Sequence, residues 1–142
     1  MIRTKRFTVL AAAALIALLG TASGARAGEV SAARDAETPF LVKIHADWCG
    51  TCTRMEPTWE KIEAREGTQV RVVIFDVTDR ASVARSREEA DRLGLRAFFD
   101  EYRGRTGTAA VLHGATREPL EVWKGELDAS VYESALAAAR TS

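Results

Sequence analysis

Both cysteines of this 142-residue chain lie in one short run, Asp47-Trp48-Cys49-Gly50-Thr51-Cys52. The apolar segment 40–46 runs into it and predicts a β-strand, and the segment 52–66 runs out of it and predicts a helix. Cys49 is therefore expected at a helix N-terminus, where unpaired N–H groups and the helix dipole favour a thiolate over a thiol. Cys52 lies one turn further on, within reach of the same sulfur. A Cys-x-x-Cys pair between a strand and a helix indicates thiol–disulfide exchange.

The start of the chain is typical of a secretory signal peptide. A basic beginning is followed by the apolar run 7–19 and by the small-x-small sequence Ala25-Arg26-Ala27. A membrane-spanning helix needs about 20 apolar residues, which is more than this run has, although an uncleaved anchor is an alternative. We expect a signal peptide over 1–27, a linker over 28–38 and a domain over 39–142. This predicts a periplasmic or otherwise exported protein after cleavage near Ala27.

Composition narrows the class of protein further. The first 27 residues hold four of the 20 cations and no acid, so the rest of the chain has a formal charge of −4. This balance, with no basic stripe, argues against binding to nucleic acid. Residues 28–142 suffice for one hydrophobic core and not for two. Export would place the cysteine pair in an oxidising compartment.

The rest of the chain predicts an α/β fold. Strands are expected over 70–77, 109–113 and 120–123, the last two as a hairpin, and helical segments over 79–93, 95–102 and after Asp128. The strand–helix–strand beginning implies a parallel pair with a right-handed crossover, and the hairpin adds an antiparallel edge. We therefore expect a four-stranded mixed sheet with helices on both faces.

Apolar spacing predicts which side chains form the core. Met55, Trp59 and Ile62 share one face of the first helix, and Phe98 and Phe99 are expected to be buried. For the last helix, the spacing favours an inner face made of Val131, Ala135 and Ala138.

The run Ala46-Asp47-Trp48-Cys49-Gly50-Thr51-Cys52, with Pro57 five residues later, resembles the thioredoxin family. Together with Asp76-Val77-Thr78 it looks most like the periplasmic thioredoxin-like domain of transmembrane thiol reductases. The resemblance implies the minimal thioredoxin fold, catalytic roles for Cys49 and Cys52, and a structural role for Pro57. It also implies substrate-binding positions at Trp48, Gly50, Thr51, Gly107, Thr108 and Gly125.

Three positions depart from the family pattern. The family usually has a cis-proline before its third strand, where this chain has Thr106-Gly107-Thr108. A non-proline cis bond costs about 3 kcal/mol, so a trans peptide is expected there. Lys43 stands where a buried aspartate is usual, and His45 replaces a common aromatic residue. Both are candidates for proton handling or for tuning of the cysteine pair.

These observations predict an exported protein thiol–disulfide oxidoreductase without a cofactor. It would act as a monomer on protein disulfides or dithiols, with a membrane thiol reductase as a candidate electron source and no nucleic acid partner. The direction of exchange stays open, although the absence of histidine between the cysteines leans toward a reductant. A purely structural disulfide is a weaker alternative, because so small a loop stabilises little. The rival function is a metallochaperone that uses the same thiolates, with His45 and His113 as the available extra ligands.

Overall fold

A four-stranded sheet organises residues 37–141, the part of the chain that the computed structural model describes. Its strands are β1 (Phe40–His45), β2 (Arg71–Asp76), β3 (Thr108–Leu112) and β4 (Pro119–Lys124), in the order β2-β1-β3-β4. β1 pairs in parallel with β2 and antiparallel with β3, and β3 pairs antiparallel with β4. The predicted mixed sheet is therefore confirmed. The expected signal peptide lies outside the described residues, as does most of the expected linker.

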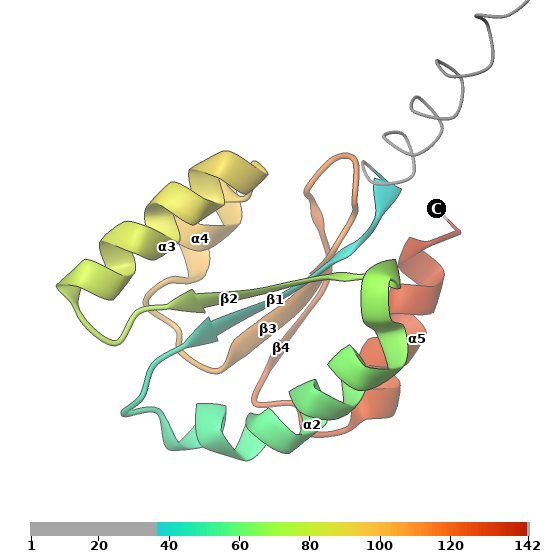
Figure 1. The fold of residues 1–142 in the computed structure, drawn as a ribbon, viewed down its shortest axis with the longest axis horizontal. Helices are drawn as coiled ribbons and strands as arrows, with labels where there is room; N and C mark the ends of the chain where they lie inside the picture. Colours follow the sequence, from blue (N-terminus) through green and yellow to red (C-terminus); the bar gives the residue numbers. More distant parts are fainter. Residues whose placement is uncertain (1–36, 142) are drawn as a thin grey trace, which may run out of the picture. The chain divides into compact units, whose positions relative to one another are not determined.

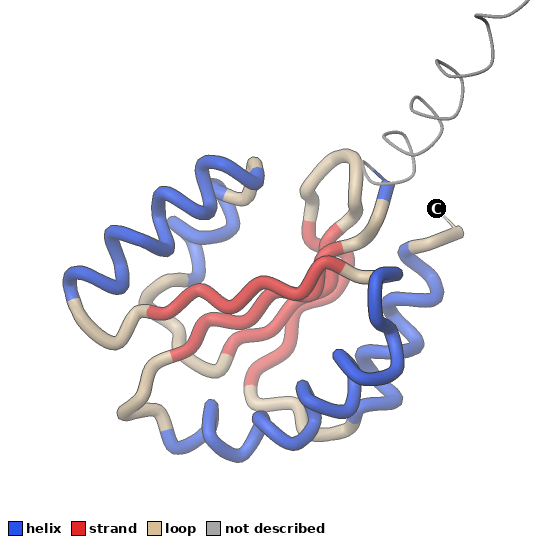
Figure 2. Tube along the Cα trace, viewed as in Figure 1, coloured by secondary structure: helices blue, strands red, loops and turns tan. Residues whose placement is uncertain are grey.

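Helices cover both faces of this sheet, as Figures 1 and 2 show. One layer holds α2 (Gly50–Glu66) and α5 (Ala129–Ala139), and a 3₁₀ turn, η1 (Gly67–Gln69), follows α2. The other layer holds α3 (Arg80–Leu93) and α4 (Arg96–Tyr102). Within residues 37–141, no helix has the length and apolar character needed to cross a membrane.

Strand β1 is central, and its side chains alternate between two cores. Phe40, Val42 and Ile44 contribute to the core under α3 and α4, whereas Leu41 belongs to the core under α2 and α5. Every residue of β1 except His45 is buried. Burial on both faces explains why the sequence of this strand is almost continuously apolar. A rigid central strand therefore leads directly to the cysteine run.

Local signals set the ends of the helices. Cys49 is the N-cap of α2, and Gly67, with a φ of +53°, follows its last residue. Asp79 caps α3 by accepting a hydrogen bond from the Ser82 N–H at 2.7 Å. Gly94, with a φ of +73°, ends α3 in the left-handed conformation that glycine adopts easily. These boundaries lie within two residues of those expected from sequence.

The predicted inner face of α5 was wrong by one position. The buried residues are Tyr132, Leu136 and Ala139, while Val131 and Ala135 are only partly buried and Ala138 is exposed. Tyr132 can be buried because its hydroxyl donates to the carbonyl oxygen of Glu126 at 3.0 Å. Its ring also packs edge-on against Trp59 and Trp123.

Candidate functional site

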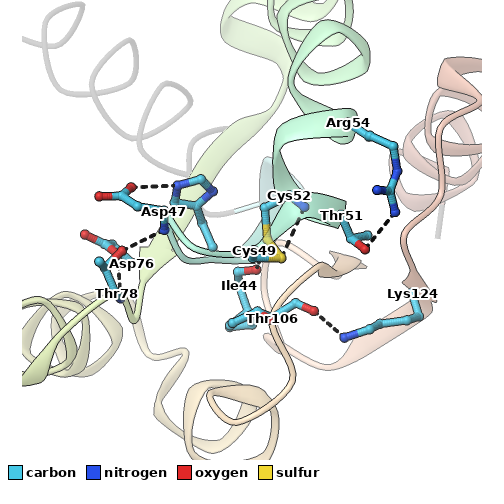
Figure 3. Close-up of a disulfide and its surroundings, with 11 residues drawn as sticks. Ile44, Asp47, Cys49, Thr51, Cys52, Arg54, Asp76, Thr78, Thr106 and Lys124 are labelled. Carbon is cyan, nitrogen blue, oxygen red and sulfur yellow. Dashed lines mark hydrogen bonds and ion pairs between the residues drawn. A yellow bond between two sulfur atoms is a disulfide. The ribbon is translucent and has the colours of Figure 1, made fainter.

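The cysteine run lies at the carboxyl end of β1, where the chain turns into α2 (Figure 3). Cys49 and Cys52 are joined by a disulfide bond, with their Cα atoms 5.2 Å apart. Cys49 is 7% exposed and Cys52 is fully buried. Solvent and partner molecules can therefore reach the pair only from the Cys49 side.

The start of α2 stabilises negative charge on Cys49. The backbone N–H of Cys52 donates to the Cys49 Sγ at 3.2 Å, in the position that an N-cap side chain occupies. This hydrogen bond and the helix dipole both favour a thiolate at Cys49. The Cys52 Sγ lies 3.7 Å from the carbonyl oxygen of Ile44, which can accept the proton of the reduced thiol. The geometry thus favours a thiolate at Cys49 and a protonated thiol at the buried Cys52.

Thr78, just beyond β2, holds the loop that precedes the cysteines. Its hydroxyl accepts from the Asp47 N–H at 3.0 Å and donates to Asp76 Oδ1 at 2.6 Å, and its carbonyl oxygen accepts from the Trp48 indole at 3.2 Å. Partial burial raises the pKa of Asp76, but the hydrogen bonds from Thr78 outweigh this and hold that pKa below its usual value. The carboxylate therefore stays charged and anchors the loop. Trp48 is 66% exposed next to Cys49, a position open to substrate.

Sequence reasoning noted Thr78 only as part of a resemblance and gave it no place in the site. A signal was available, because Asp76 and Thr78 lie at the end of a predicted strand that was expected to run parallel to the strand before the cysteines. The carboxyl ends of parallel neighbours meet at one edge of the sheet. The exact partners, however, depend on the Cα register, which pairs His45 with Asp76.

Two glycines form the opposite wall of the site. A Cβ atom added to Gly107 would lie 3.1 Å from the Thr51 methyl and 3.9 Å from the Cys49 Sγ, and one added to Gly125 would lie 2.9 Å from that methyl. The Gly125 N–H donates to the Gly107 carbonyl oxygen at 2.9 Å, which joins the two segments. Both glycines have positive φ angles, and no peptide bond in the described part of the chain is cis. Gly50 is exposed on the first turn of α2, whereas Thr108 is only 4% exposed and does not present its side chain to solvent.

Lys43 and His45, the two candidates for tuning, lie on β1 without a hydrogen bond to either sulfur. The Lys43 ammonium lies 4.9 Å from the centroid of the Trp59 ring, and the residue is 2% exposed. Burial lowers the pKa of Lys43, while Glu56 and Glu63 act in the opposite direction.

The His45 side chain faces the loop before the cysteines. Its Nε2 lies 3.4 Å from Asp47 Oδ1, and its Nδ1 is buried without a hydrogen-bond partner. Roles in tuning remain predictions for both His45 and Lys43.

An open groove of about 510 Å³ adjoins the exposed Trp48. Val77, Val83 and Thr106 line it together with the α4 end, which contributes Asp100, Glu101 and Arg103. The groove combines apolar side chains with a charged rim. It borders Trp48, the residue directly before Cys49 in the sequence.

No group of three or more His, Cys, Asp or Glu side chains within residues 37–141 is arranged to hold a metal ion. His113, considered above as a ligand, has another contact. Its Nδ1 accepts hydrogen bonds from the N–H groups of Ala115 and Thr116, at 3.1 and 3.3 Å, and so stabilises the hairpin turn.

In this α/β domain the central strand leads to a Cys-x-x-Cys disulfide at the start of a helix. This arrangement is the thioredoxin fold. Residues 29–89 match the family model described as Thioredoxin. This match supports the resemblance to the thioredoxin family that the sequence predicted.

Curated relatives share part of this sequence, and a solved structure shares the fold. The chain is 36% identical to mitochondrial thioredoxin of Bos taurus over 50 residues, which is 35% of this chain and 30% of that protein. It is 40% identical to thioredoxin of Mycolicibacterium smegmatis over 50 residues, covering 35% and 45% of the two chains. The matched region thus spans less than half of these relatives. The exposed lipoprotein thioredoxin of Streptococcus pneumoniae shares the fold, with a TM-score of 0.53 at 15% identity over 75% of this chain and 88% of that one.

Proposed function

We propose that this chain is an exported thiol–disulfide oxidoreductase that exchanges disulfides with partner proteins. One observation carries the proposal: the Cys49 Sγ accepts the N–H at the start of α2, while Cys52 is buried behind it. This arrangement provides an activated nucleophile and a second thiol that can resolve its product. The exposed Trp48 and the groove beside it offer room for a polypeptide substrate.

The exchange proceeds in two balanced steps. In the reduced pair, the Cys49 thiolate attacks one sulfur of a partner disulfide, so that a mixed disulfide forms and the other partner sulfur leaves as a thiolate and takes up a proton. Cys52 then loses its proton and attacks the Cys49 sulfur, which forms the Cys49–Cys52 disulfide and releases the second partner thiol. The partner gains two electrons and two protons, and the pair is oxidised. Run backwards, the same steps oxidise a partner dithiol.

A reductant role needs an external source of electrons. An exported pair is exposed to an oxidising compartment, where it accumulates as the disulfide unless another protein reduces it. A membrane thiol reductase that carries electrons outward supplies this chemistry. In this role the chain acts as a monomeric carrier between that reductase and its protein substrates, and needs no cofactor.

Insulin reduction tests the proposed activity. With dithiothreitol as electron donor, we expect the protein to reduce insulin disulfides well above the rate of dithiothreitol alone, because the N–H group at the start of α2 favours the Cys49 thiolate. The precipitation of the free insulin B chain gives the rate. A rate equal to that of dithiothreitol alone would exclude the activity. Equilibration with a glutathione redox buffer then gives the reduction potential and hence the favoured direction.

Export is tested on the intact chain expressed in a bacterial host. We expect the secreted form to begin near Gly28, because a small residue at Ala25 and at Ala27 suits signal cleavage. Mass spectrometry of the periplasmic fraction measures this start. Ala27→Leu removes the small residue next to the cut and should leave the uncleaved mass in the membrane fraction. An unprocessed wild-type chain in the cytoplasm would contradict the proposal.

A further inference from the structure

Two cationic side chains, Arg54 and Lys124, lie on one side of the cysteine pair, and a third, Arg105, lines a hollow together with Lys124. Arg54 comes from α2, Lys124 from the end of β4 and Arg105 from the loop before β3, and all three are exposed. In Figure 3, Arg54 and Lys124 lie on the opposite side of the disulfide from Asp47 and Asp76. We call Arg54, Arg105 and Lys124 the cationic patch.

The patch is tied to the residues that surround Cys49. Arg54 Nη2 donates to Thr51 Oγ1 at 3.0 Å, and the Lys124 ammonium donates to the carbonyl oxygen of Thr106. Thr51 lies between the two cysteines in sequence, and Thr106 precedes the glycine that faces the Cys49 sulfur. Arg54 and Lys124 are therefore held next to the residues that surround Cys49.

Arg105 and Lys124 also line a hollow of about 400 Å³. Tyr102, Val122 and Trp123 contribute to the same hollow, and no acidic side chain lines it. Val122 is 38% exposed on the edge strand. The hollow thus combines positive charge with apolar surface, a combination that suits a peptide segment carrying carboxylates.

The charge of the patch is not neutralised by the protein itself. Within residues 37–141, none of the three cations forms a salt bridge. Glu126 is near in sequence, but its Oε1 accepts the N–H groups of Leu127 and Asp128, both at 2.8 Å. A partner carboxylate would therefore meet cations that have no ion pair within the described residues.

We propose that the cationic patch binds an acidic segment of the partner polypeptide next to its target cysteine. This inference rests on the proposed function and names the class of substrate that the site prefers. Opposite charges of partner and enzyme accelerate encounter and fix the orientation of the bound chain. Exposed ion pairs contribute modestly, so two or three of them favour an acidic substrate by about three- to tenfold.

Two synthetic peptides test the inference. Each contains one intramolecular disulfide, and they differ only in the residues flanking one cysteine, which are acidic in the first peptide and basic in the second. With dithiothreitol as electron donor at low ionic strength, we expect kcat/KM to be about three- to tenfold higher for the acidic peptide. The preference should shrink in about 0.5 M salt, because salt screens exposed charges.

Charge reversal identifies the residues responsible. The double variant Arg54→Glu/Arg105→Glu should prefer the basic peptide, and Lys124→Gln should weaken the acidic preference. Lys61→Glu is the matched control, because Lys61 is exposed on α2 and lies outside the patch. It should keep the wild-type preference.

The outcomes separate the inference from the function on which it rests. If the protein reduces insulin but uses both peptides equally well, the proposed role of the cationic patch is wrong and the proposed oxidoreductase function stands. An equal loss on both peptides in the double variant would also overturn that role, since that result indicates a structural effect. Tighter binding of a single-stranded DNA oligonucleotide than of the acidic peptide would assign the patch to another partner. Failure to reduce insulin and both peptides would instead refute the proposed function.

Discussion

Cys49→Ser is expected to abolish disulfide reduction, whereas Cys52→Ser should accumulate stable mixed disulfides with partner proteins. The two substitutions remove the same atom three residues apart, yet they stop the exchange at different steps. Loss of the attacking thiolate should lower the rate of insulin reduction by more than about a thousandfold. Without the Cys52 thiol, Cys49 can still attack the partner disulfide, but the mixed disulfide is not resolved and the partner is not released.

The roles follow from the surroundings of each sulfur. Cys49 is the more exposed residue of the two, and its Sγ accepts the Cys52 N–H at 3.2 Å. The Cys52 Sγ is fully buried and faces a carbonyl oxygen, which favours its protonated form. Non-reducing electrophoresis of the protein isolated from its host cell, followed by mass spectrometry of the adducts, measures the trapped species. Adducts on Cys49→Ser together with none on Cys52→Ser would mean that the roles are reversed.

Much of this site could be predicted from the sequence because its main signal is local. A strand, a Cys-x-x-Cys run and a helix follow one another within 27 residues, from Phe40 to Glu66, and their order alone places Cys49 at the helix start. The sheet followed from a similarly short-range pattern, because a strand–helix–strand unit and a tight hairpin leave few topologies. The match of residues 29–89 to the thioredoxin model then agreed with that pattern.

Contacts between distant segments could not be obtained in this way. Thr78 reaches the loop at Asp47 from 31 residues away, and its role depends on the register between β1 and β2. The inner face of α5 was misplaced because simple apolar spacing treats a tyrosine as uncertain, although Tyr132 satisfies its hydroxyl at Glu126. The contact of Lys43 with Trp59 joins a strand to the middle of a helix, and no spacing rule predicts it.

Lys43→Met is expected to raise the free energy of unfolding by about 1 to 2 kcal/mol at neutral pH. Methionine keeps the length and apolar character of the lysine stem and removes an ammonium that burial disfavours. The contact of the ammonium with the Trp59 ring offsets only part of this cost. Urea denaturation measures the change. Lys61→Met, on the exposed side of α2, is the control and should change stability by less than about 0.5 kcal/mol.

The pH dependence of stability provides an independent check. Burial lowers the pKa of Lys43 below 10.5, so the unfolded chain binds this proton more tightly than the folded one. The contribution of Lys43 to the free energy of unfolding therefore rises with pH between its folded-state pKa and about 10.5. This contribution is lowest at pH values below that range. In the Lys43→Met variant this rise should be absent, and the gain over wild type should shrink as pH approaches 10.5. A gain that does not depend on pH would mean that methionine acts through packing alone.

The same substitution tests whether Lys43 tunes the cysteine pair. The Lys43 ammonium contacts the Trp59 ring and has no hydrogen bond to either sulfur, so it acts on the cysteine pair through space. A unit charge about 10 Å away in a protein interior changes the energy of a thiolate by about 1 to 2 kcal/mol. Because the ammonium favours the reduced, ionised pair, its loss should make the reduction potential more negative by about 10 to 30 mV. If Lys43→Met stabilises the protein but leaves the reduction potential of the cysteine pair unchanged, the role of Lys43 is structural only.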